Sequence, residues 1–485
     1  METLPYHDFR GFIEEAKKVS DWRLIEGADW DIEIGALVES TAELVSQPPM
    51  LVFDRIKGYP PGFRVISLPY AAYKRVALAL GLPLDKSKLE LLRLAARKIS
   101  SAKPIPPRIV KDSPLFENVM EGANVDLLKF PALRFHESDG GRYFGPGGGL
   151  INADPETGYV NLGTYRMQLH DRRTLGLWMS PGQNGRQICT KYWQQGKSCP
   201  VVATYGQHPL VFMSSYTKFP YGHSELEVSG GLIGAPLDVV KGPITGLPMP
   251  ASSEIAIEGE VPPPSEEARD EGPFGEWPGY YSGGTIGTGE PQPVIRVKAV
   301  YYRNDPILED EAPLWPGAVK LDLHISGGVL WDQLENAGVQ DIVGVYNHTS
   351  YLSVVAIKQK YAGHAKQAGL AAMGCSAGAR NGRYVVVVDE DIDPTNLKEV
   401  LWAMMTRVDP KSDIDIVEGC WSTPLDPRMP PDKRDNHDHT NSRAIFYAVR
   451  PFAWRDRFPQ VSRSSRELRE QTIAKYKHII PFPGI

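Results

Sequence analysis

The stretch Tyr159–Gln168, YVNLGTYRMQ, sets the character of the middle of the chain. Its valine, threonine and tyrosine residues favour extended backbone, and turns marked by glycine or proline flank it. The same texture runs from Pro114 to about Asn304, which predicts many short strands and therefore a β-barrel or β-sandwich. The other strands expected here are Leu175–Met179, Val201–Tyr205, Leu210–Ser215, Leu237–Val240, Ile255–Glu260 and Val294–Tyr302.

Outward from this region, both flanks are expected to mix helices with strands, because apolar residues recur there at three- and four-residue spacing. The proline-marked connection Lys103–Pro114 predicts a domain boundary. The N-terminal helices are expected at Phe9–Val19, Ile32–Val45, Tyr70–Leu82 and Leu89–Ile99, with a strand at Met50–Ile56. The C-terminal helices are expected at Leu330–Gly338, Tyr351–Met373, Leu397–Val408 and Arg466–Ile479, with strands at Tyr384–Val388 and Ala444–Val449.

Composition narrows the class of protein. A length of 485 residues predicts two or three domains, and 42% hydrophobic with 23% charged residues is typical of a globular chain. The 53 basic and 59 acidic residues give a net charge of −6 without a long basic block, so we expect neither nucleic acid nor a membrane as partner. No apolar run is long enough to span a bilayer, and the N-terminus has no signal-peptide core.

The cysteines and the common motifs exclude several chemistries. Four cysteines lie far apart without a CxxC pair, which is typical of a reduced compartment, so we expect a cytoplasmic protein without zinc or an Fe–S cluster. The glycine run Phe144–Leu150, FGPGGGL, is a poor dinucleotide fingerprint, and no Walker A, GxSxG or HExxH motif occurs. The four cysteines mentioned above are Cys189, Cys199, Cys375 and Cys420.

A candidate acid pair lies in Asp270–Ser282, DEGPFGEWPGYYS. Glu271 and Glu276 stand five residues apart in a segment too rich in glycine and proline for a helix, and such a pair can act as proton donor and electrostatic partner. Nearby aromatic rings, including that of Trp277, would desolvate the acids and raise at least one pKa. The alternative is a solvated acidic turn.

Three further groups of polar residues have weaker signals. Asn161 and Arg166 would point to opposite faces of a regular strand, so both can line one site only if the strand begins late or kinks near Gly163; otherwise Arg166 is a surface residue. Glu225 needs partners from elsewhere to hold a metal, and the nearby His223 is typical of a turn. The cations Lys358, Lys360, His364 and Lys366 are expected on a helix, as a phosphate contact or a solvated face.

Together these segments resemble the UbiD family of decarboxylases. The forms GTYRMQ and RPFAWRDRFP look most like the branch that acts on hydroxylated aromatic acids. The matching stretches, in the family's order between Asp154 and Pro459, are DPETGYVNLGTYRMQ, SELEVSGGLIGAPLDVVKG, EGPFGEWPGYY, IKQKYAGHAK and SRAIFYAVRPFAWRDRFP.

The resemblance implies a mixed α+β fold with an N-terminal α/β region at 1–112, a split β-barrel flavin-binding domain at 113–315 and a C-terminal α/β oligomerisation domain at 316–485. It implies prenylated FMN as cofactor, made by a separate prenyl-FMN-forming transferase, with its phosphate held through Mn2+ or Mg2+ and K+. The implied reaction is reversible, non-oxidative decarboxylation of an aromatic or heteroaromatic acid, with CO2 as product. The implied assembly is a homodimer or higher homo-oligomer.

Site residues carry over by motif. Arg166, Glu271 and Glu276 resemble the family's catalytic Glu–Arg–Glu set, in which Arg166 would pair with Glu271 and orient the substrate carboxylate, and Glu276 would protonate the carbon that loses CO2. The implied cofactor contacts are Gly163, Thr164, Tyr165, Arg166, Gln183, Ser214, Ser215 and Lys366. The implied metal ligands are Asn161, Asn184 and Glu225.

The metal site departs from the family pattern at one position. The family usually has histidine in a segment resembling SPGKHGR, whereas this chain reads SPGQNGRQ and has Asn184 there. An amide oxygen still suits a hard cation such as Mg2+ or Mn2+ but is a weaker ligand than imidazole. Two alternatives to a decarboxylase therefore stay open: a carboxylase subunit of a larger complex, and a non-catalytic family member with impaired cofactor binding. The intact Arg166, Glu271 and Glu276 favour an enzyme.

Overall fold

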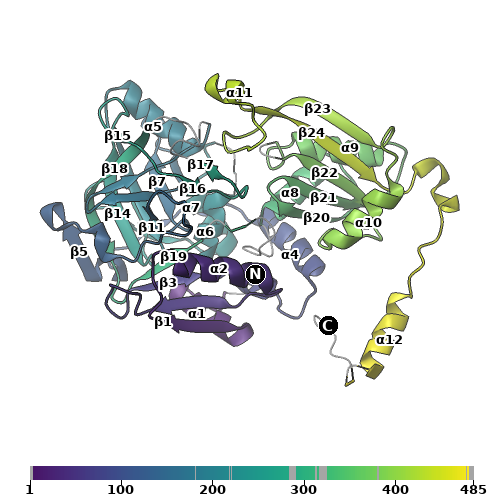
Figure 1. Ribbon diagram of the computed structural model, residues 1–485, viewed down its shortest axis with the longest axis horizontal. Coiled ribbons are helices and arrows are strands. Elements are labelled where there is room, and N and C mark those ends of the chain that lie inside the picture. Colours follow the sequence, from purple (N-terminus) through teal and green to yellow (C-terminus); the bar gives the residue numbers. More distant parts are fainter. Residues whose placement is uncertain are drawn as a thin grey trace.

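The computed structural model describes residues 4–180, 182–217, 219, 221–282, 291–311, 314–315, 325–379, 382–476 and 478–479. Its strands form a small N-terminal sheet, a large curled central sheet and a separate five-stranded C-terminal sheet, all accompanied by helices (Figure 1). The mixed fold expected from the sequence is confirmed.

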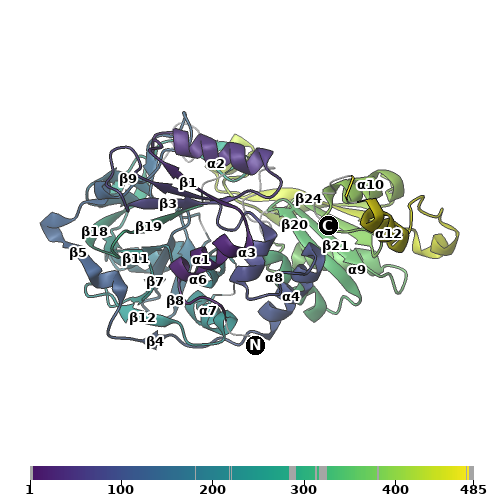
Figure 2. The ribbon, with the colours of Figure 1, turned by 90° about the horizontal axis from the view of Figure 1, so that it is seen from below.

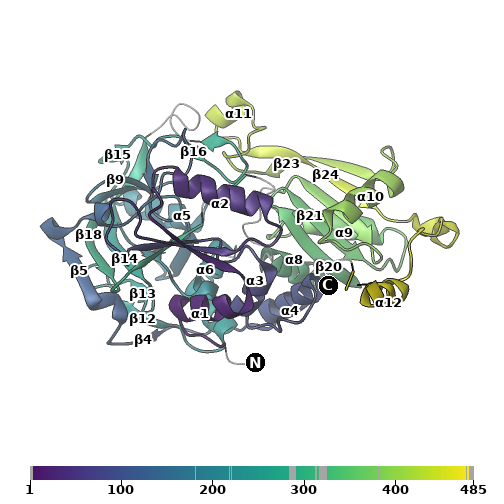
Figure 3. The ribbon, with the colours of Figure 1, turned by 60° about the horizontal axis from the view of Figure 1, so that its bottom comes forward.

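The N-terminal sheet has a helix on each face (Figure 3). Successive residues of a strand point to opposite faces, and here both sets are apolar, so both faces need to be covered. Its order is β1 (Trp22–Glu26), β2 (Met50–Asp54), β3 (Arg64–Ser67) and β19 (Ile307–Asp310). In β2, Leu51 and Phe53 pack on the side of α2 (Glu33–Leu44), whereas Met50 and Val52 pack on the side of α1 (Phe9–Val19). Strand β19 therefore brings a segment from far along the chain into this sheet.

The central sheet is mostly antiparallel and runs in the order β6-β9-β10-β18-β14-β11-β7-β8, with β5 and β15 also paired to β18. A short sheet, β13-β12-β4, lies beside it. The strands of both are β4 (Arg108–Ile109), β5 (Asn118–Glu121), β6 (Arg142–Tyr143), β7 (Gly149–Ala153), β8 (Val160–Thr164), β9 (Gln168–Asp171), β10 (Thr174–Gly176), β11 (Cys199–Tyr205), β12 (Asp238–Lys241), β13 (Pro248–Pro250), β14 (Ile255–Val261), β15 (Ala268–Arg269) and β18 (Gln292–Tyr302). The helices of this region are α5 (Asn184–Gln194), α6 (Pro209–Tyr216) and α7 (Glu225–Ile233).

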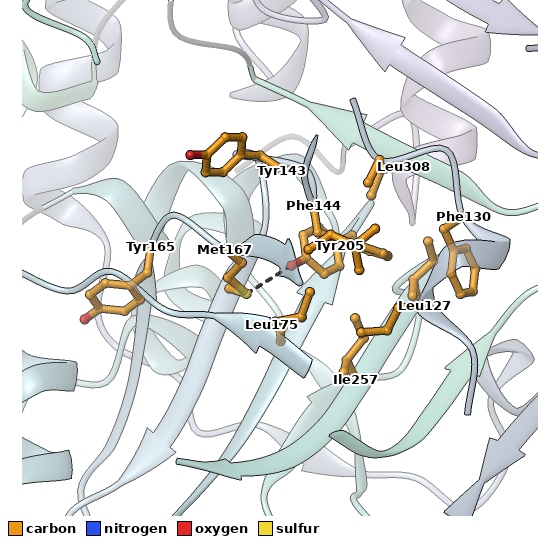
Figure 4. Packing of buried hydrophobic residues seen from close by; sticks show 14 of the residues in the cluster. Leu127, Phe130, Tyr143, Phe144, Tyr165, Met167, Leu175, Tyr205, Ile257 and Leu308 are labelled. Carbon is orange, nitrogen blue, oxygen red and sulfur yellow. Dashed lines mark hydrogen bonds between the residues drawn. The ribbon is translucent and has the colours of Figure 1, made fainter. Parts of the chain in front are cut away.

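The concave side of the curled sheet holds an aromatic-rich core (Figure 4). Tyr205 of β11 packs against Phe144 and donates its hydroxyl hydrogen to the sulfur of Met167 at 3.1 Å. A side chain at Gly148 would place its Cβ 2.2 Å from the Tyr205 ring, so the glycine run allows this close approach. The run FGPGGGL thus has a packing role in the barrel.

The C-terminal domain is a five-stranded sheet in the order β20-β21-β22-β24-β23, and β21, β22 and β24 are parallel. Helix α4 (Lys88–Ser101), from the N-terminal region, packs its Ala96 into the core of this domain beside α8, so the helix ties the two regions together (Figure 2). The elements are α8 (Ile325–Asn336), β20 (Ile342–Thr349), β21 (Leu352–Ile357), α9 (His364–Gly374), β22 (Tyr384–Asp389), α10 (Leu397–Arg407), β23 (Ile414–Trp421), α11 (Pro431–Asp435), β24 (Thr440–Ala448) and α12 (Arg466–Tyr476).

Two expected elements are wrong. Residues 210–215 form part of helix α6, because Pro209 starts the helix and His208 caps it. The helical periodicity is hidden in the sequence because all of these residues are buried. The expected helix Tyr351–Met373 is instead strand β21 followed by helix α9, which begins only after Gly363 at φ +88°. Short apolar runs buried on all sides do not distinguish helix from strand.

The remaining short elements are α3 (Tyr73–Ala79), β16 (Phe274–Gly275), β17 (Tyr281–Ser282) and four 3-10 helices at Pro114–Glu117, Gly122–Asn124, Leu127–Lys129 and Phe452–Arg457. Strand pairing crosses the predicted boundary at 112, since β4 pairs with β12 and β19 pairs with β3. The boundaries at 112 and 315 stay predictions, and residues 316–324 lie outside the described residues. In the described part of the chain, no helix is long and apolar enough to cross a membrane.

Candidate active site

The end of strand β8 explains how Asn161 and Arg166 belong to one region. The strand stops at Thr164, and Arg166 lies beyond it, where it forms an isolated bridge with Trp178. Arg166 is therefore freed from the strict alternation of a strand, so the five-residue offset no longer forces the two side chains apart. The strand therefore neither begins late nor kinks at Gly163, as the sequence led us to expect; it ends early instead.

The acid segment approaches Arg166 as a small hairpin of β16 and β17. The Glu276 N–H donates to the carbonyl of Tyr280 at 3.0 Å, and Gly279 adopts φ +84° in the turn between the strands. This turn directs Glu276 back toward Arg166, while Glu271 reaches it from the chain just before β16. Both carboxylates thus meet the same guanidinium from one ordered segment.

The three charged side chains form a buried ion network. Arg166 donates through Nε and Nη2 to the two carboxylate oxygens of Glu271, both at 2.6 Å, and through Nη1 to Glu276 and to the Ser282 hydroxyl at 3.1 Å. The exposed fractions of the three charged side chains are 5%, 3% and 10% for Arg166, Glu271 and Glu276. The Trp178 ring centre lies 4.8 Å from the Arg166 guanidinium carbon, which adds a cation–π contact.

Burial has opposite consequences for the two sides of this network. Burial lowers the pKa of the Arg166 guanidinium, but Glu271 and Glu276 outweigh it, so the pKa ends above its ordinary value and the group stays cationic. Burial raises the pKa of the Glu276 carboxyl, although Arg166 opposes this shift. Arg166 thus stays a cation, and burial lets Glu276 hold its proton to a higher pH than an ordinary glutamate does.

A cavity of about 270 Å3 opens at this network, between the curled sheet and the C-terminal domain. Its polar wall includes Arg166 and Glu276, and its remaining wall combines aromatic and apolar side chains, as in a pocket for a flat ligand. The lining residues are Pro146, Thr164, Tyr165, Arg166, Trp178, Ser180, Gln183, Phe274, Glu276, Trp277, Glu311, Thr423 and Leu425.

The expected cofactor contacts fall into two groups. Thr164, Tyr165, Arg166 and Gln183 line the cavity, and Ser215 joins them through a 2.7 Å hydrogen bond to the Thr164 hydroxyl. Gly163 precedes them in β8, where any Cβ would come within 2.6 Å of the Tyr165 hydroxyl oxygen.

Two of the expected contacts lie elsewhere. The Ser214 hydroxyl donates to the Leu210 carbonyl at 2.8 Å, and Ser214 lines a separate cavity of about 170 Å3. Lys366 does not line the central cavity; on α9 of the C-terminal domain it pairs with Asp415 at 3.3 Å, and 55% of its side chain is exposed. The structure therefore does not bring Lys366 to the others.

The expected metal ligands gather around two tyrosines. The Asn184 amide donates to the Tyr159 hydroxyl at 3.3 Å, and the Asn161 amide is hydrogen-bonded to the Tyr165 hydroxyl. Glu225 accepts the N–H of Leu162, next to Asn161, at 2.9 Å. Since the two amides use N–H groups in these contacts, their oxygens are the atoms left to bind a cation.

Burial raises the pKa of Glu225 to about 7. A carboxyl held in this way favours a positive partner when it ionises. In the described residues, no group of three or more His, Cys, Asp or Glu side chains is placed to hold a metal ion. A cation at this place would therefore rely on the two asparagine amides together with Glu225.

Two helices begin at these residues. Asn184 opens α5 and Glu225 opens α7, and neither helix has a side-chain cap at its N-terminus. Asn152 links β8 to the start of α5, because it accepts from Asn161 at 3.1 Å and donates to the Gly185 carbonyl at 3.0 Å. Two helix N-termini without a side-chain cap, beside oxygen ligands, provide the partial positive charge that favours a phosphate.

Several cavity residues had no recognisable signal in the sequence. Trp178, Glu311, Thr423 and Leu425 reach the cavity from three separate segments, since the last two share one loop. Each residue is unremarkable locally, and Thr423 and Leu425 belong to the C-terminal domain, so only the packing of that domain against the central sheet could place them.

Three family models match the chain. They are described as the N-terminal, Rift-related and C-terminal domains of 3-octaprenyl-4-hydroxybenzoate carboxy-lyase and match residues 23–98, 108–314 and 328–448. The Rift-related domain covers the curled sheet, in agreement with the expected split barrel.

Relatives and solved structures cover nearly the whole chain. A phenolic acid decarboxylase from Streptomyces sp. (strain D7) is 32% identical over 88% of this chain and 90% of its own length. A pyrrole-2-carboxylic acid decarboxylase from Pseudomonas aeruginosa is 31% identical over 84% of each chain. The UbiD-class enzyme HmfF from Pelotomaculum thermopropionicum, solved with FMN, superposes with a TM-score of 0.81 at 28% identity, covering 97% of this chain and 100% of that one.

An evolved dimeric form of HmfF, solved with prFMN, superposes with a TM-score of 0.80 at 26% identity over 97% of this chain and 100% of that one. The three matched models cover the N-terminal region, the barrel and the C-terminal domain, in that order along the chain. The chain belongs to the UbiD family of carboxy-lyases.

Proposed function

We propose that this protein decarboxylates an aromatic or heteroaromatic carboxylic acid, phenolic acids included, without net oxidation and with prenylated FMN as cofactor. The observation that carries the proposal is the buried network of Arg166, Glu271 and Glu276 at the wall of a cavity between two domains. The names of the relatives support the substrate class, and the prFMN-bound form of HmfF supports the cofactor.

The donor set of the site fits the phosphate end of such a cofactor. Asn161, Asn184 and Glu225 offer oxygen ligands of the kind Mn2+ or Mg2+ prefers, and K+ accepts oxygen ligands of the same kind. The uncapped starts of α5 and α7 favour a phosphate beside that cation. When bound, prenylated FMN would supply the electron sink for cleavage of the carbon–carboxylate bond.

The protein's own residues would bind the acid and manage its proton. Arg166, kept cationic by Glu271, would orient the substrate carboxylate and favour negative charge in the cavity. Glu276, whose pKa is raised by burial, would donate its proton to the carbon that loses CO2. One proton enters the ring, one CO2 leaves, and Glu276 recovers a proton from solvent, so the overall reaction balances as acid to arene and CO2.

The same residues would serve the reverse direction. In carboxylation, the ionised Glu276 would act as the base that removes the ring proton. A carboxylase subunit of a larger complex is therefore the second candidate. Asn184 in the position of the family's usual histidine is the observation that favours the third candidate, a member that binds cofactor poorly. We further propose a homodimer or higher homo-oligomer, as in the dimeric form of HmfF.

The test is to co-express the chain with a prenyl-FMN-forming transferase, identify the released small molecules by mass spectrometry, and assay CO2 release from hydroxybenzoic and pyrrole carboxylic acids. The proposal expects prenylated FMN near one per chain and CO2 release from at least one acid. Plain FMN or no flavin, under conditions that load a histidine-bearing relative, would reject it in favour of the poorly binding member.

A further inference from the structure

The residue after the expected proton donor contacts the C-terminal domain. Trp277 lines the cavity and packs its ring against that of Tyr351, with ring centres 4.9 Å apart and planes inclined at 43°. The Trp277 N–H also donates to the Glu276 carboxylate at 3.3 Å. The hairpin turn and the C-terminal sheet lie on facing sides of the two domains (Figure 1). A displacement of Trp277 would therefore change both the orientation and the hydrogen bonding of Glu276.

Tyr351 is itself held by the ion pair of Arg383 with Asp426. The parallel register of β21 and β22 places Tyr351 beside Arg383, whose N–H donates to the Tyr351 carbonyl at 3.1 Å. The Arg383 guanidinium carbon lies 5.2 Å from the centre of the Tyr351 ring, and the guanidinium also pairs with Asp426. The side chain of Asp426 is 1% exposed and that of Arg383 is 21% exposed, so the acid of this pair is shielded from solvent.

Asp426 also organises a loop that forms a second wall of the cavity. Its carboxylate accepts from the Ser422 hydroxyl at 3.0 Å, from the Arg428 N–H at 2.9 Å and from Asn441 at 3.3 Å. Its own N–H donates to the Thr423 carbonyl at 3.0 Å. The loop closed by these bonds carries Thr423 and Leu425, both of which line the cavity.

We propose that Asp426 and Arg383 are positioning residues that set both walls of the active cavity. Through Tyr351 they hold Trp277, and with it the acid Glu276, while through the loop at 422–428 they hold Thr423 and Leu425. Neither Asp426 nor Arg383 lines the cavity, so each acts only through other residues. This proposal deepens the function proposed above and rests on it for its kinetic test, but not for its structural test.

The kinetic test uses graded variants of the cofactor-loaded enzyme. Tyr351→Ala removes the ring that supports Trp277 and should lower kcat about tenfold with a smaller change in KM, because the acid acts in the chemical step. Tyr351→Phe should stay within about twofold of wild type, because the ring remains and the hydroxyl has no hydrogen-bond partner among the described residues.

Asp426→Asn should lower kcat and raise KM together, since it loosens both walls. The double variant Asp426→Asn/Tyr351→Ala should lower kcat no further than the more damaged single variant, because both act on one chain of contacts. Matched controls lie at the two ends of β22, the strand that follows Arg383. Asp391→Asn breaks an ion pair with Arg407 just beyond the far end of β22, and Tyr384→Ala removes a half-exposed ring; both should stay within about twofold of wild type.

The structural test is hydrogen–deuterium exchange of the full chain, which needs no substrate. Tyr351→Ala and Asp426→Asn should each speed exchange in residues 274–282 and 421–430 while β14 and β18 stay unchanged, whereas Asp391→Asn should leave both segments unchanged. The proposal would be overturned if Tyr351→Phe or the control variants lost as much kcat as Tyr351→Ala, or if the losses of kcat in the double variant were additive. Unchanged exchange at 274–282 would overturn it too.

The two tests separate this proposal from the one it rests on. If the variants speed hydrogen–deuterium exchange in both segments but the protein releases CO2 from no acid, the positioning role is supported and the proposed reaction is rejected. If the protein releases CO2 but the variants leave exchange in these segments unchanged, the reaction is supported and the positioning role is rejected.

Discussion

Arg166 and Glu271 form a two-point hydrogen bond, in which Nε and Nη2 each lie 2.6 Å from one carboxylate oxygen. This geometry uses one edge of the guanidinium and leaves Nη1 for Glu276 and the cavity. A planar guanidinium locked along one edge cannot rotate away from the site. Glu271 therefore fixes the orientation of Arg166, whereas Glu276 contacts the guanidinium through Nη1 alone, in agreement with the proton-donor role proposed for it.

Replacement of the planar guanidinium of Arg166 by the single ammonium group of a lysine should damage this arrangement. Arg166→Lys keeps the charge but cannot make two parallel hydrogen bonds to Glu271, so we expect kcat/KM to fall at least about thirtyfold, roughly 2 kcal/mol. The matched control is Arg269→Lys, whose arginine pairs with Asp171 in the same domain and is 37% exposed, and which should change kcat/KM by less than about twofold. Equal activity of Arg166→Lys and wild type would contradict the orienting role.

Glu276→Gln should abolish turnover without loss of cofactor. A glutamine keeps the size and one acceptor oxygen but has no acidic proton to give, so a fall of about 10²–10⁴ in kcat is expected. Flavin absorbance and the mass of the released cofactor should stay at wild-type levels. Glu266→Gln, at an exposed acid upstream of the same hairpin, serves as the control. Near-normal turnover would remove Glu276 from the proton-donor role.

The dependence of kcat on pH should report the same acid. Burial raises the pKa of Glu276 above its ordinary value of 4.5, and Arg166, Glu271 and Tyr143 are the charged or titratable groups that couple to it. A proton donor acts in its protonated form, so kcat should be fully present below the raised pKa and fall as pH rises through it. A pH profile of kcat in the forward direction measures this fall. A kcat that rises across that range would exclude Glu276 as donor.

Asn184→His tests the unusual metal ligand. Imidazole binds divalent metals more tightly than an amide oxygen, so the variant should hold or raise the content of metal and flavin per chain. Elemental analysis and flavin absorbance of protein produced with the transferase measure both. Gln187→His, three residues on and exposed on α5, controls for a histidine on the same helix. Loss of cofactor in Asn184→His would show that Asn184 belongs to a differently built site.

Much of the chemistry was predictable because it depends on residue types in short segments. The pair of acids in DEGPFGEWPGYYS, and the neighbouring rings that bury them, are visible in one stretch of sequence, and the raised pKa of Glu276 agrees with that reasoning. The secondary structure was harder where a run is buried on all sides. Residues 210–215 are such a run and form a helix where a strand was expected. The helix expected at 351–373 merges strand β21 with helix α9, which Gly363 separates.

The sequence alone determined the family, the mixed fold and the identity of the charged set, since motifs and local patterns carry that information. Only the tertiary structure decided which side chains share one cavity. It ends β8 before Arg166, joins Ser215 to Thr164, leaves Lys366 with Asp415, and brings Thr423 and Leu425 from the C-terminal domain. The reason is physical: these contacts join residues up to hundreds of positions apart, and their geometry follows from strand pairing and domain packing, which no local pattern encodes.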